Sequence, residues 1–151
     1  MGVRLSTDEA WECIEASHTG IVTTLRRDGF PITLPVWFVV IDREVYLRTP
    51  ARSKKVARVR HDSRAGFLVE SGERWVELKA VSFTAHASVV EDEPVRAQVL
   101  AMLSDKYQQY RASRSALPTA TVQHYASPDA IVRLTPEGRI LTWDNARIVL
   151  S

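Results

Sequence analysis

The sequence has almost no cysteine and no long hydrophobic run. Cys13 is the only cysteine among 151 residues, so the chain cannot form an internal disulfide, which is usual for proteins of the reducing cytosol. No apolar stretch approaches the roughly 20 residues that a membrane helix requires, and the first residues lack the apolar segment of a signal peptide. We therefore expect a cytoplasmic protein that does not bind membranes.

The common motifs of metal, nucleotide and nucleophile sites are also absent. The four histidines, His18, His61, His86 and His124, lie far apart without the spacing of metal ligands, so no metal site is expected. The sequence contains no G-x-G-x-x-G pattern, no Walker loop and no G-x-S-x-G pattern. Nothing marks a catalytic residue.

The net charge is small, but the positive charges are unevenly placed. A formal charge of +2 gives the molecule no strong overall field for nucleic acid. Seven basic residues nevertheless crowd into one short stretch: Arg48, Arg52, Lys54, Lys55, Arg58, Arg60 and Arg64. A nucleic-acid module is one interpretation of this cluster, but the stretch lacks interleaved aromatic residues, so we favour a local anion site.

The composition indicates one soluble globular domain over residues 1–151, because 45% of residues are hydrophobic, 25% are charged, and no repeat or linker occurs. Three helices are predicted. Ser6 and Glu9 form a capping-box pattern before a helix over 7–18, Ser53 caps a helix over 53–62, and Pro94 begins a third helix. The buried face of the third helix is expected to hold Val95, Val99, Met102, Leu103 and Tyr110.

Strands outnumber helices. They are predicted over 21–26, 32–41, 44–49, 64–70 and 75–90, with a closing hairpin of 130–134 and 139–143 around 136–138. Asp28-Gly29 is a hairpin signal, and Pro35 indicates a strand edge or a separation from the neighbouring strand. A change of apolar face within 75–90 indicates a bulge near 79–81. The predicted fold is mainly β: an antiparallel barrel with helical additions.

Three groups of residues are candidates for a binding site. Thr49, Ser53, Lys54 and Lys55 surround a helix start that attracts phosphate, although a capped surface helix is the simpler interpretation. The run Pro35, Val36, Trp37 and Phe38 offers an apolar wall for a flat ring, although core packing is the simpler role. Lys79 shares a strand face with Trp75, and Trp143 stands near the C-terminus, where it either closes the core or reaches a partner subunit.

The order of several short segments, 20–31, 35–38, 46–49, 53–55 and 61–64, resembles the pyridoxamine 5′-phosphate oxidase-like superfamily of FMN-binding split barrels. The likeness covers about residues 7–145 and is greatest to the actinobacterial branch of F420- or FMN-dependent oxidoreductases. It implies a six-stranded split β-barrel that forms a homodimer with the cofactor between the subunits. The C-terminal arginine pattern of the true pyridoxamine 5′-phosphate oxidases is not evident, so vitamin B6 oxidation is not expected.

The resemblance also implies a function and a set of site residues. The expected function is an oxidoreductase that binds coenzyme F420, or alternatively FMN, and transfers a hydride to a small conjugated organic acceptor. A non-catalytic protein that binds or stores a flavin, a deazaflavin or haem is the alternative. The cofactor-binding residues implied are Pro35, Val36, Trp37, Phe38, Thr49, Ser53, Lys54, Lys55, Lys79, Ala80 and Trp143.

Overall fold

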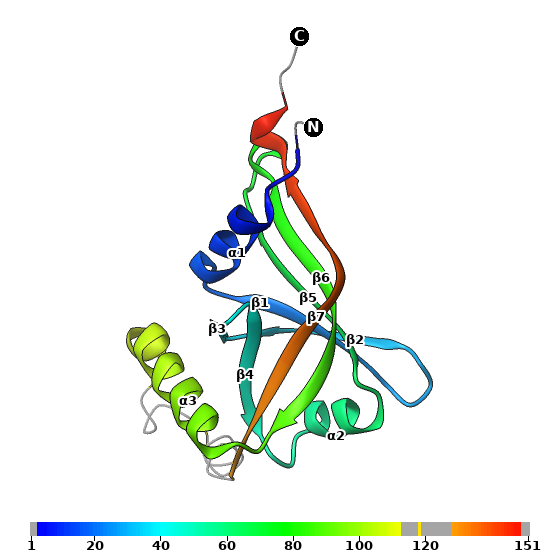
Figure 1. Cartoon of the computed structure of the whole chain (residues 1–151), viewed down its shortest axis with the longest axis vertical. Coiled ribbons are helices and arrows are strands. Elements are labelled where there is room, and N and C mark those ends of the chain that lie inside the picture. Colours follow the sequence, from blue (N-terminus) through cyan, green and yellow to red (C-terminus); the bar gives the residue numbers. More distant parts are fainter. Residues whose placement is uncertain (1–2, 113–117, 119–127, 149–151) are drawn as a thin grey trace.

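The structure is a computed structural model in which residues 3–112, 118 and 128–148 are described. They form one antiparallel sheet of seven strands in the order β2-β1-β5-β6-β7-β4-β3 (Figure 1). The strands are β1 Gly20–Leu25, β2 Pro31–Val36, β3 Phe38–Ile41, β4 Glu44–Pro50, β5 Arg64–Ser71, β6 Lys79–Val90 and β7 Asp129–Asp144. The helices are α1 Thr7–Ala16, α2 Lys54–His61 and α3 Glu93–Tyr107, with 3₁₀ turns η1 Trp75–Glu77, η2 Gln108–Tyr110 and η4 Asn145–Arg147.

One residue joins the two edges of this sheet and explains the strand count. The predicted strand 32–41 is interrupted at Trp37, so that β2 pairs with β1 at one edge while β3 pairs with β4 at the other. The mainly β split-barrel fold is therefore confirmed, with seven strands instead of six because Trp37 divides one strand into two. Pro35 lies in the edge strand β2, where a missing N–H group costs no ladder hydrogen bond.

The predicted strand 75–90 is wrong at its start. Residues Trp75–Glu77 form the 3₁₀ turn η1, and β6 begins only at Lys79. This turn produces the change of apolar face that the sequence placed in a bulge near 79–81. The irregular pairing of β6 with β7 lies further along, between Ser82 and Thr84.

The predicted closing hairpin around 136–138 is also wrong. β7 continues from Asp129 to Asp144 and pairs with β6 over both halves of its length. Ser82 pairs with Leu141 and Thr84 with Glu137, so residues 138–140 of β7 face a single residue of β6. Gly138 adopts a φ of 73° here. Pro136 keeps its regular pairing with Ala85, and Gly138 lies in a β-bulge, which keeps the strand direction.

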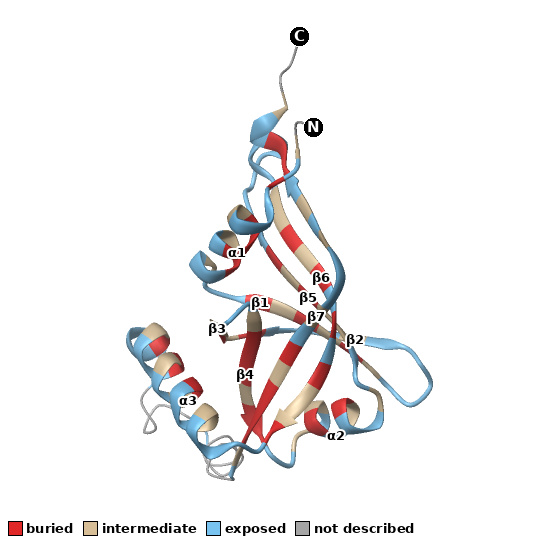
Figure 2. Ribbon diagram, viewed as in Figure 1, coloured by how far each residue is buried: buried red, intermediate tan, exposed pale blue. Residues whose placement is uncertain are grey.

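Two hydrophobic cores lie on the two faces of the curled sheet (Figure 2). Phe38, Phe67 and Phe83 fill the barrel interior with Trp11 of α1. The second core lies under α3, whose buried residues are Val99, Leu103 and Tyr107. Tyr110 was expected on this stripe, but it is exposed in η2, because the 3.6-residue repeat places Tyr107 below Leu103.

The helix starts follow the sequence closely. Ser6 and Glu9 make both hydrogen bonds of the capping box at α1, which ends at Ala16, two residues before the expected end. His18 therefore lies outside the helix. Most of the polar stretch 113–125 lies outside the described residues. No described helix is long and apolar enough to cross a membrane.

Candidate functional site

Strand β4 leads directly into the start of α2, and hydroxyl groups hold this junction. The Ser53 N–H donates to the Pro50 carbonyl oxygen at 2.9 Å, and the buried Thr49 hydroxyl donates to Ser53 Oγ at 3.1 Å. Ser53 Oγ also accepts the Val56 N–H at 3.4 Å, as an N-cap does. The Ser53 hydroxyl proton is left to donate to a further acceptor.

The first turn of α2 carries positive charge, although negative charge at this position stabilises a helix. Lys54 and Lys55 are the first two helical residues, and this turn contains no acidic residue. The dipole of a helix destabilises cations at its N-terminus and stabilises anions there. Burial, helped by the nearby Arg58 charge, lowers the pKa of Lys55 below the usual lysine value. An anion at this position would relieve both penalties.

Part of the basic cluster is already engaged within the chain. Arg48 forms an ion pair of 3.0 Å with Asp129, and Arg64 forms one of 2.8 Å with Asp62. The Arg58 side chain donates to the Thr24 hydroxyl at 2.9 Å. Within the described ranges, five of the seven cations in this cluster make no ion pair: Arg52, Lys54, Lys55, Arg58 and Arg60. We call residues 49–55 the basic corner.

The predicted aromatic wall is mostly part of the protein core. Phe38 is fully buried in the barrel interior. Trp37, which separates β2 from β3, is partly buried and stacks on Tyr107 of α3, with ring centroids 4.5 Å apart and planes 5° apart. The preceding residues differ from each other: Pro35 is exposed on β2, whereas Val36 is buried beside Gly20 of β1.

A polar cluster that the sequence did not reveal secures the break at Trp37. The Tyr107 hydroxyl accepts the Phe38 N–H at 3.0 Å and lies 2.7 Å from the His18 carbonyl oxygen. Lys106 Nζ donates to the Phe38 carbonyl oxygen at 3.0 Å. Burial raises the pKa of Tyr107 to about 12 and lowers that of Lys106 to about 8. The helical spacing of Leu103 and Tyr107 is the signal in the sequence for this cluster, because it places Tyr107 instead of Tyr110 on the buried face of α3.

Lys79, Ala80 and Trp143 come together at the opposite end of the sheet from the basic corner (Figure 1). Lys79 pairs with Asp144 and Ala80 with Trp143, whereas Pro50 pairs with Asp129 at the other end of β7. At about 3.3 Å per residue, the 16 residues of β7 span up to about 50 Å. One chain therefore does not place both groups around a single mononucleotide.

Exposed hydrophobic side chains surround this far end, which we call the sheet tip. Asn145 fastens η1 to the end of β7, because its side chain donates to the Trp75 carbonyl oxygen at 2.6 Å and its N–H donates to that of Leu78 at 2.9 Å. Trp75, Leu141 and Trp143 are each more than half exposed. The exposed apolar residues of the sheet tip are Trp75, Val76, Leu78, Leu141 and Trp143.

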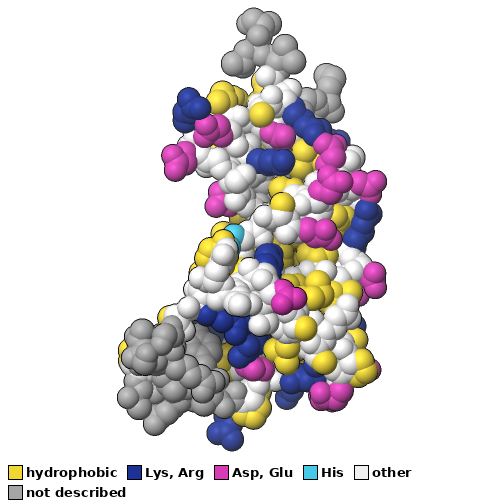
Figure 3. Space-filling view, turned by 90° about the vertical axis from the view of Figure 1, so that its left-hand side faces the viewer, with side chains coloured by type: hydrophobic (Ala, Val, Ile, Leu, Met, Phe, Trp, Pro, Cys, Tyr) yellow, Lys and Arg dark blue, Asp and Glu magenta, His cyan; other side chains and the backbone are white. Residues whose placement is uncertain are grey.

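Other kinds of site receive little support from the described residues. No three histidine, cysteine, aspartate or glutamate side chains come together there as a metal site would require. On the face that carries α1 and α3, basic and acidic side chains are intermingled (Figure 3). The sequence's His124 lies outside the described residues.

A curled antiparallel sheet whose edges meet at Trp37 places this protein in the split-barrel class. Residues 6–142 match the pyridoxamine 5′-phosphate oxidase family, and the chain belongs to that family. None of the curated proteins matches the sequence.

Solved structures share this fold. A conserved hypothetical protein, Rv2991, from Mycobacterium tuberculosis is 28% identical, with a TM-score of 0.81 over 97% of this chain and 89% of that one. An FAD-binding protein from Mesorhizobium loti is 20% identical, with a TM-score of 0.71 over 94% and 97% of the two chains. The haem storage protein HutZ from Vibrio cholerae is 17% identical, with a TM-score of 0.69 over 91% and 94%.

Proposed function

We propose that this protein is an oxidoreductase that binds a phosphate-bearing flavin or deazaflavin at the basic corner. The start of α2 carries the proposal: two lysines occupy its first turn without an acidic residue, beside the Thr49–Ser53 hydroxyl pair. Helix N–H groups, lysine ammonium groups and a serine hydroxyl together make a suitable site for a phosphate group. Membership of the family and the FAD-binding relative of the same fold support this choice of ligand.

The chain's residues would bind and orient the cofactor. Lys55 and the Ser53 hydroxyl would hold its phosphate, while Thr49, being buried and bonded to Ser53, would fix the direction of that hydroxyl. When bound in its reduced form, such a cofactor supplies a hydride to a small conjugated organic acceptor, and solvent supplies the proton that completes the reduction. No side chain of the described residues is assigned as a catalytic acid or base.

We favour F420 over FMN because the basic corner and the rest of α2 together have more cations than one phosphate needs. Arg52 and Arg60 make no ion pair within the described residues, and they lie in the same short stretch as Lys54 and Lys55. The F420 tail carries several carboxylates beyond its phosphate, and these would engage the additional arginines. FMN, which has a single phosphate, would leave them unused.

The proposed site is shared between two copies of the chain. The basic corner and the sheet tip lie at opposite ends of β7, so Lys79, Ala80 and Trp143 reach a bound cofactor only from a partner subunit. The exposed apolar side chains of the sheet tip give such a partner a surface to bury. The expected assembly is a homodimer.

Cofactor titration tests this function directly. The purified protein is mixed with F420 and, separately, with FMN, and binding is followed by fluorescence. Micromolar or tighter binding of either cofactor supports the proposal, and tighter binding of F420 supports the deazaflavin assignment. If neither cofactor binds at 100 μM, the binding free energy is weaker than roughly −5.5 kcal/mol, and the proposed function is rejected.

Turnover distinguishes the enzyme from a binding or storage protein. The haem storage protein of the same fold makes storage the second candidate, and the described residues provide no assigned proton donor. Reduced F420 or FMN is incubated with quinones, enones and tetrapyrroles, and its absorbance is followed over many turnovers. Tight binding with no oxidation above the protein-free rate would favour storage.

A further inference from the structure

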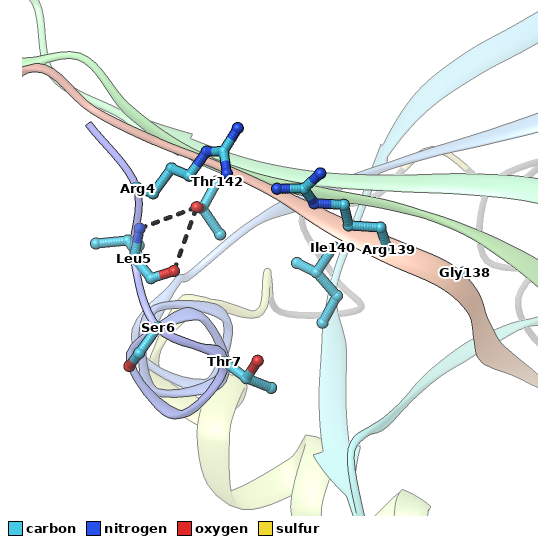
Figure 4. Close-up of a pocket in the computed structure, with 8 residues that line it drawn as sticks. All are labelled: Arg4, Leu5, Ser6, Thr7, Gly138, Arg139, Ile140 and Thr142. Carbon is cyan, nitrogen blue, oxygen red and sulfur yellow. Dashed lines mark hydrogen bonds between the residues drawn. The ribbon is translucent and has the colours of Figure 1, made fainter. Parts of the chain in front are cut away.

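A polar pocket lies between the N-terminal segment and the bulge of β7, far from the start of α2 (Figure 4). Its volume is about 450 Å³, which is within the usual range for small-molecule sites. Arg4 from the N-terminal segment and Arg139 from the bulge both line it. Their side chains extend toward one another past Thr142 (Figure 4).

The two arginines lack the partners that other arginines of this region have. Arg43 pairs with Asp8, and Arg147 pairs with Glu9, so the acidic residues at the start of α1 are already neutralised. In residues 3–112, 118 and 128–148, neither Arg4 nor Arg139 makes an ion pair. Two like charges that face one another across a pocket repel, and an anion between them would remove the repulsion.

The pocket lies along an open edge of β7. β4 pairs with β7 only as far as Leu134, so the later part of β7 has an open edge that the N-terminal segment partly covers. The Asp144 N–H on this edge donates to the Val3 carbonyl oxygen at 2.7 Å. Because N–H groups alternate along a strand, the Thr142 N–H points to the same edge, toward the pocket.

The remaining lining defines the ligand further. The Thr142 hydroxyl accepts the Leu5 N–H at 2.9 Å, which fixes the N-terminal segment against the strand. Ser6 Oγ accepts the Glu9 N–H, so its own proton is left to donate to a ligand. Leu5 and Ile140 add apolar surface, and Ile140 packs against the main core. The pocket therefore combines cationic and hydroxyl donors with a small apolar wall.

We propose that this pocket binds a small organic anion, with its phosphate or carboxylate groups between Arg4 and Arg139. Guanidinium groups pair with both kinds of oxyanion in two-point geometry, so the shared chemistry is an oxyanion on a compact body. The site is separate from the basic corner and does not depend on a cofactor.

Amide resonances of ¹⁵N-labelled protein test the proposal. Inorganic phosphate and succinate are added in separate titrations at constant ionic strength. We expect saturable shifts of the Thr142 and Arg139 amides with at least one anion, and the tighter of the two identifies a phosphate or a carboxylate ligand. Absence of a saturable shift at Thr142 with both anions would overturn the proposal.

Variants show whether the arginines are responsible. Arg139→Gln and Arg4→Gln should each weaken binding at least tenfold. Arg27→Gln removes an equal charge from an exposed turn and should leave the titration unchanged, as should Lys55→Ala in the basic corner. Equal weakening in Arg27→Gln would show a general charge effect and refute the site. Lys55→Ala also separates the two proposals. Loss of cofactor binding in this variant concerns the basic corner, whereas loss of the Thr142 shift concerns only the pocket.

Discussion

The starts of α1 and α2 are built in opposite ways. At α1, Ser6 and Glu9 satisfy each other's backbone N–H groups, and Asp8 and Glu9 match the helix dipole. At α2, Ser53 provides a cap, but Val56 occupies the position of Glu9, and the first turn holds two lysines. The first helix start is complete within the chain. The second has two cations and no acidic residue in its first turn, and this difference is the reason that we propose the cofactor site there.

The largest expected effect comes from removing the half-buried lysine of α2. Lys55→Ala should weaken binding of F420 or FMN by about 10- to 100-fold, because hydrogen bonds to charged groups contribute about 1.5–3 kcal/mol. Fluorescence titration measures the change. Arg43→Ala removes a charge beside α1 and should alter affinity less than twofold. If the two variants lose affinity equally, the start of α2 is not the binding site.

The caps should differ in their contribution to stability. Ser6→Ala should lower the free energy of unfolding by about 1 kcal/mol, because the variant loses the hydroxyl that accepts the Glu9 N–H. Ser53→Ala should cost less in the cofactor-free protein, since its bond to Val56 N–H is 3.4 Å long and is not reciprocated. Urea denaturation measures both. A larger loss for Ser53→Ala would contradict the comparison.

Reversing a charge in the first turn of α2 should raise the stability of the cofactor-free protein and lower its affinity for the cofactor. Lys54→Glu places a carboxylate in the first turn and should stabilise the cofactor-free protein by about 0.3–1 kcal/mol. The same variant should bind F420 more weakly. The matched change at α1, Glu9→Lys, removes the ion pair with Arg147 and should destabilise the protein without affecting cofactor affinity. Urea denaturation and cofactor titration are run on each variant.

The smallest effect is a dependence on pH that belongs to α1. Hydrogen bonds from Arg147 and Ser6 lower the pKa of Glu9 to about 2 from 4.5. The folded protein therefore binds a proton at Glu9 less readily than the unfolded chain does. The contribution of Glu9 to the free energy of unfolding is complete above pH 4.5 and declines as the pH falls toward 2. Glu9→Gln should remove this part of the acid sensitivity, measured as the urea midpoint between pH 5 and 3. An unchanged pH profile would show that Glu9 does not contribute.

Local signals in the sequence predicted local structure well. The capping box needs only Ser6 and Glu9, and the Asp28-Gly29 turn forms with Gly29 at a φ of 86°. Pro35 correctly indicated a strand edge. The glycine at 138 was misread, because a glycine with positive φ suits a bulge as well as a turn, and only pairing with β6 distinguishes them.

The candidate site was harder to predict than the fold, because some of its charges form ion pairs with residues that are distant in the sequence. The sequence showed seven basic residues between 48 and 64, but not that Asp129, some 80 positions later, neutralises Arg48. The aromatic run at Trp37 was also ambiguous. Tyr107 of α3 stacks on Trp37, and Phe38 enters the barrel core, so the wall expected for a ring is mainly internal packing.

By itself, the sequence determined the strand-rich class, the helix caps and the cationic start of α2, because each depends on residues within a few positions of one another. The tertiary structure alone decided that the sheet's two edges meet at Trp37, that β7 runs unbroken through its bulge, and that Arg4 faces Arg139 across a pocket. These features depend on contacts between distant segments, and the free energy of burying both cores determines which segments meet.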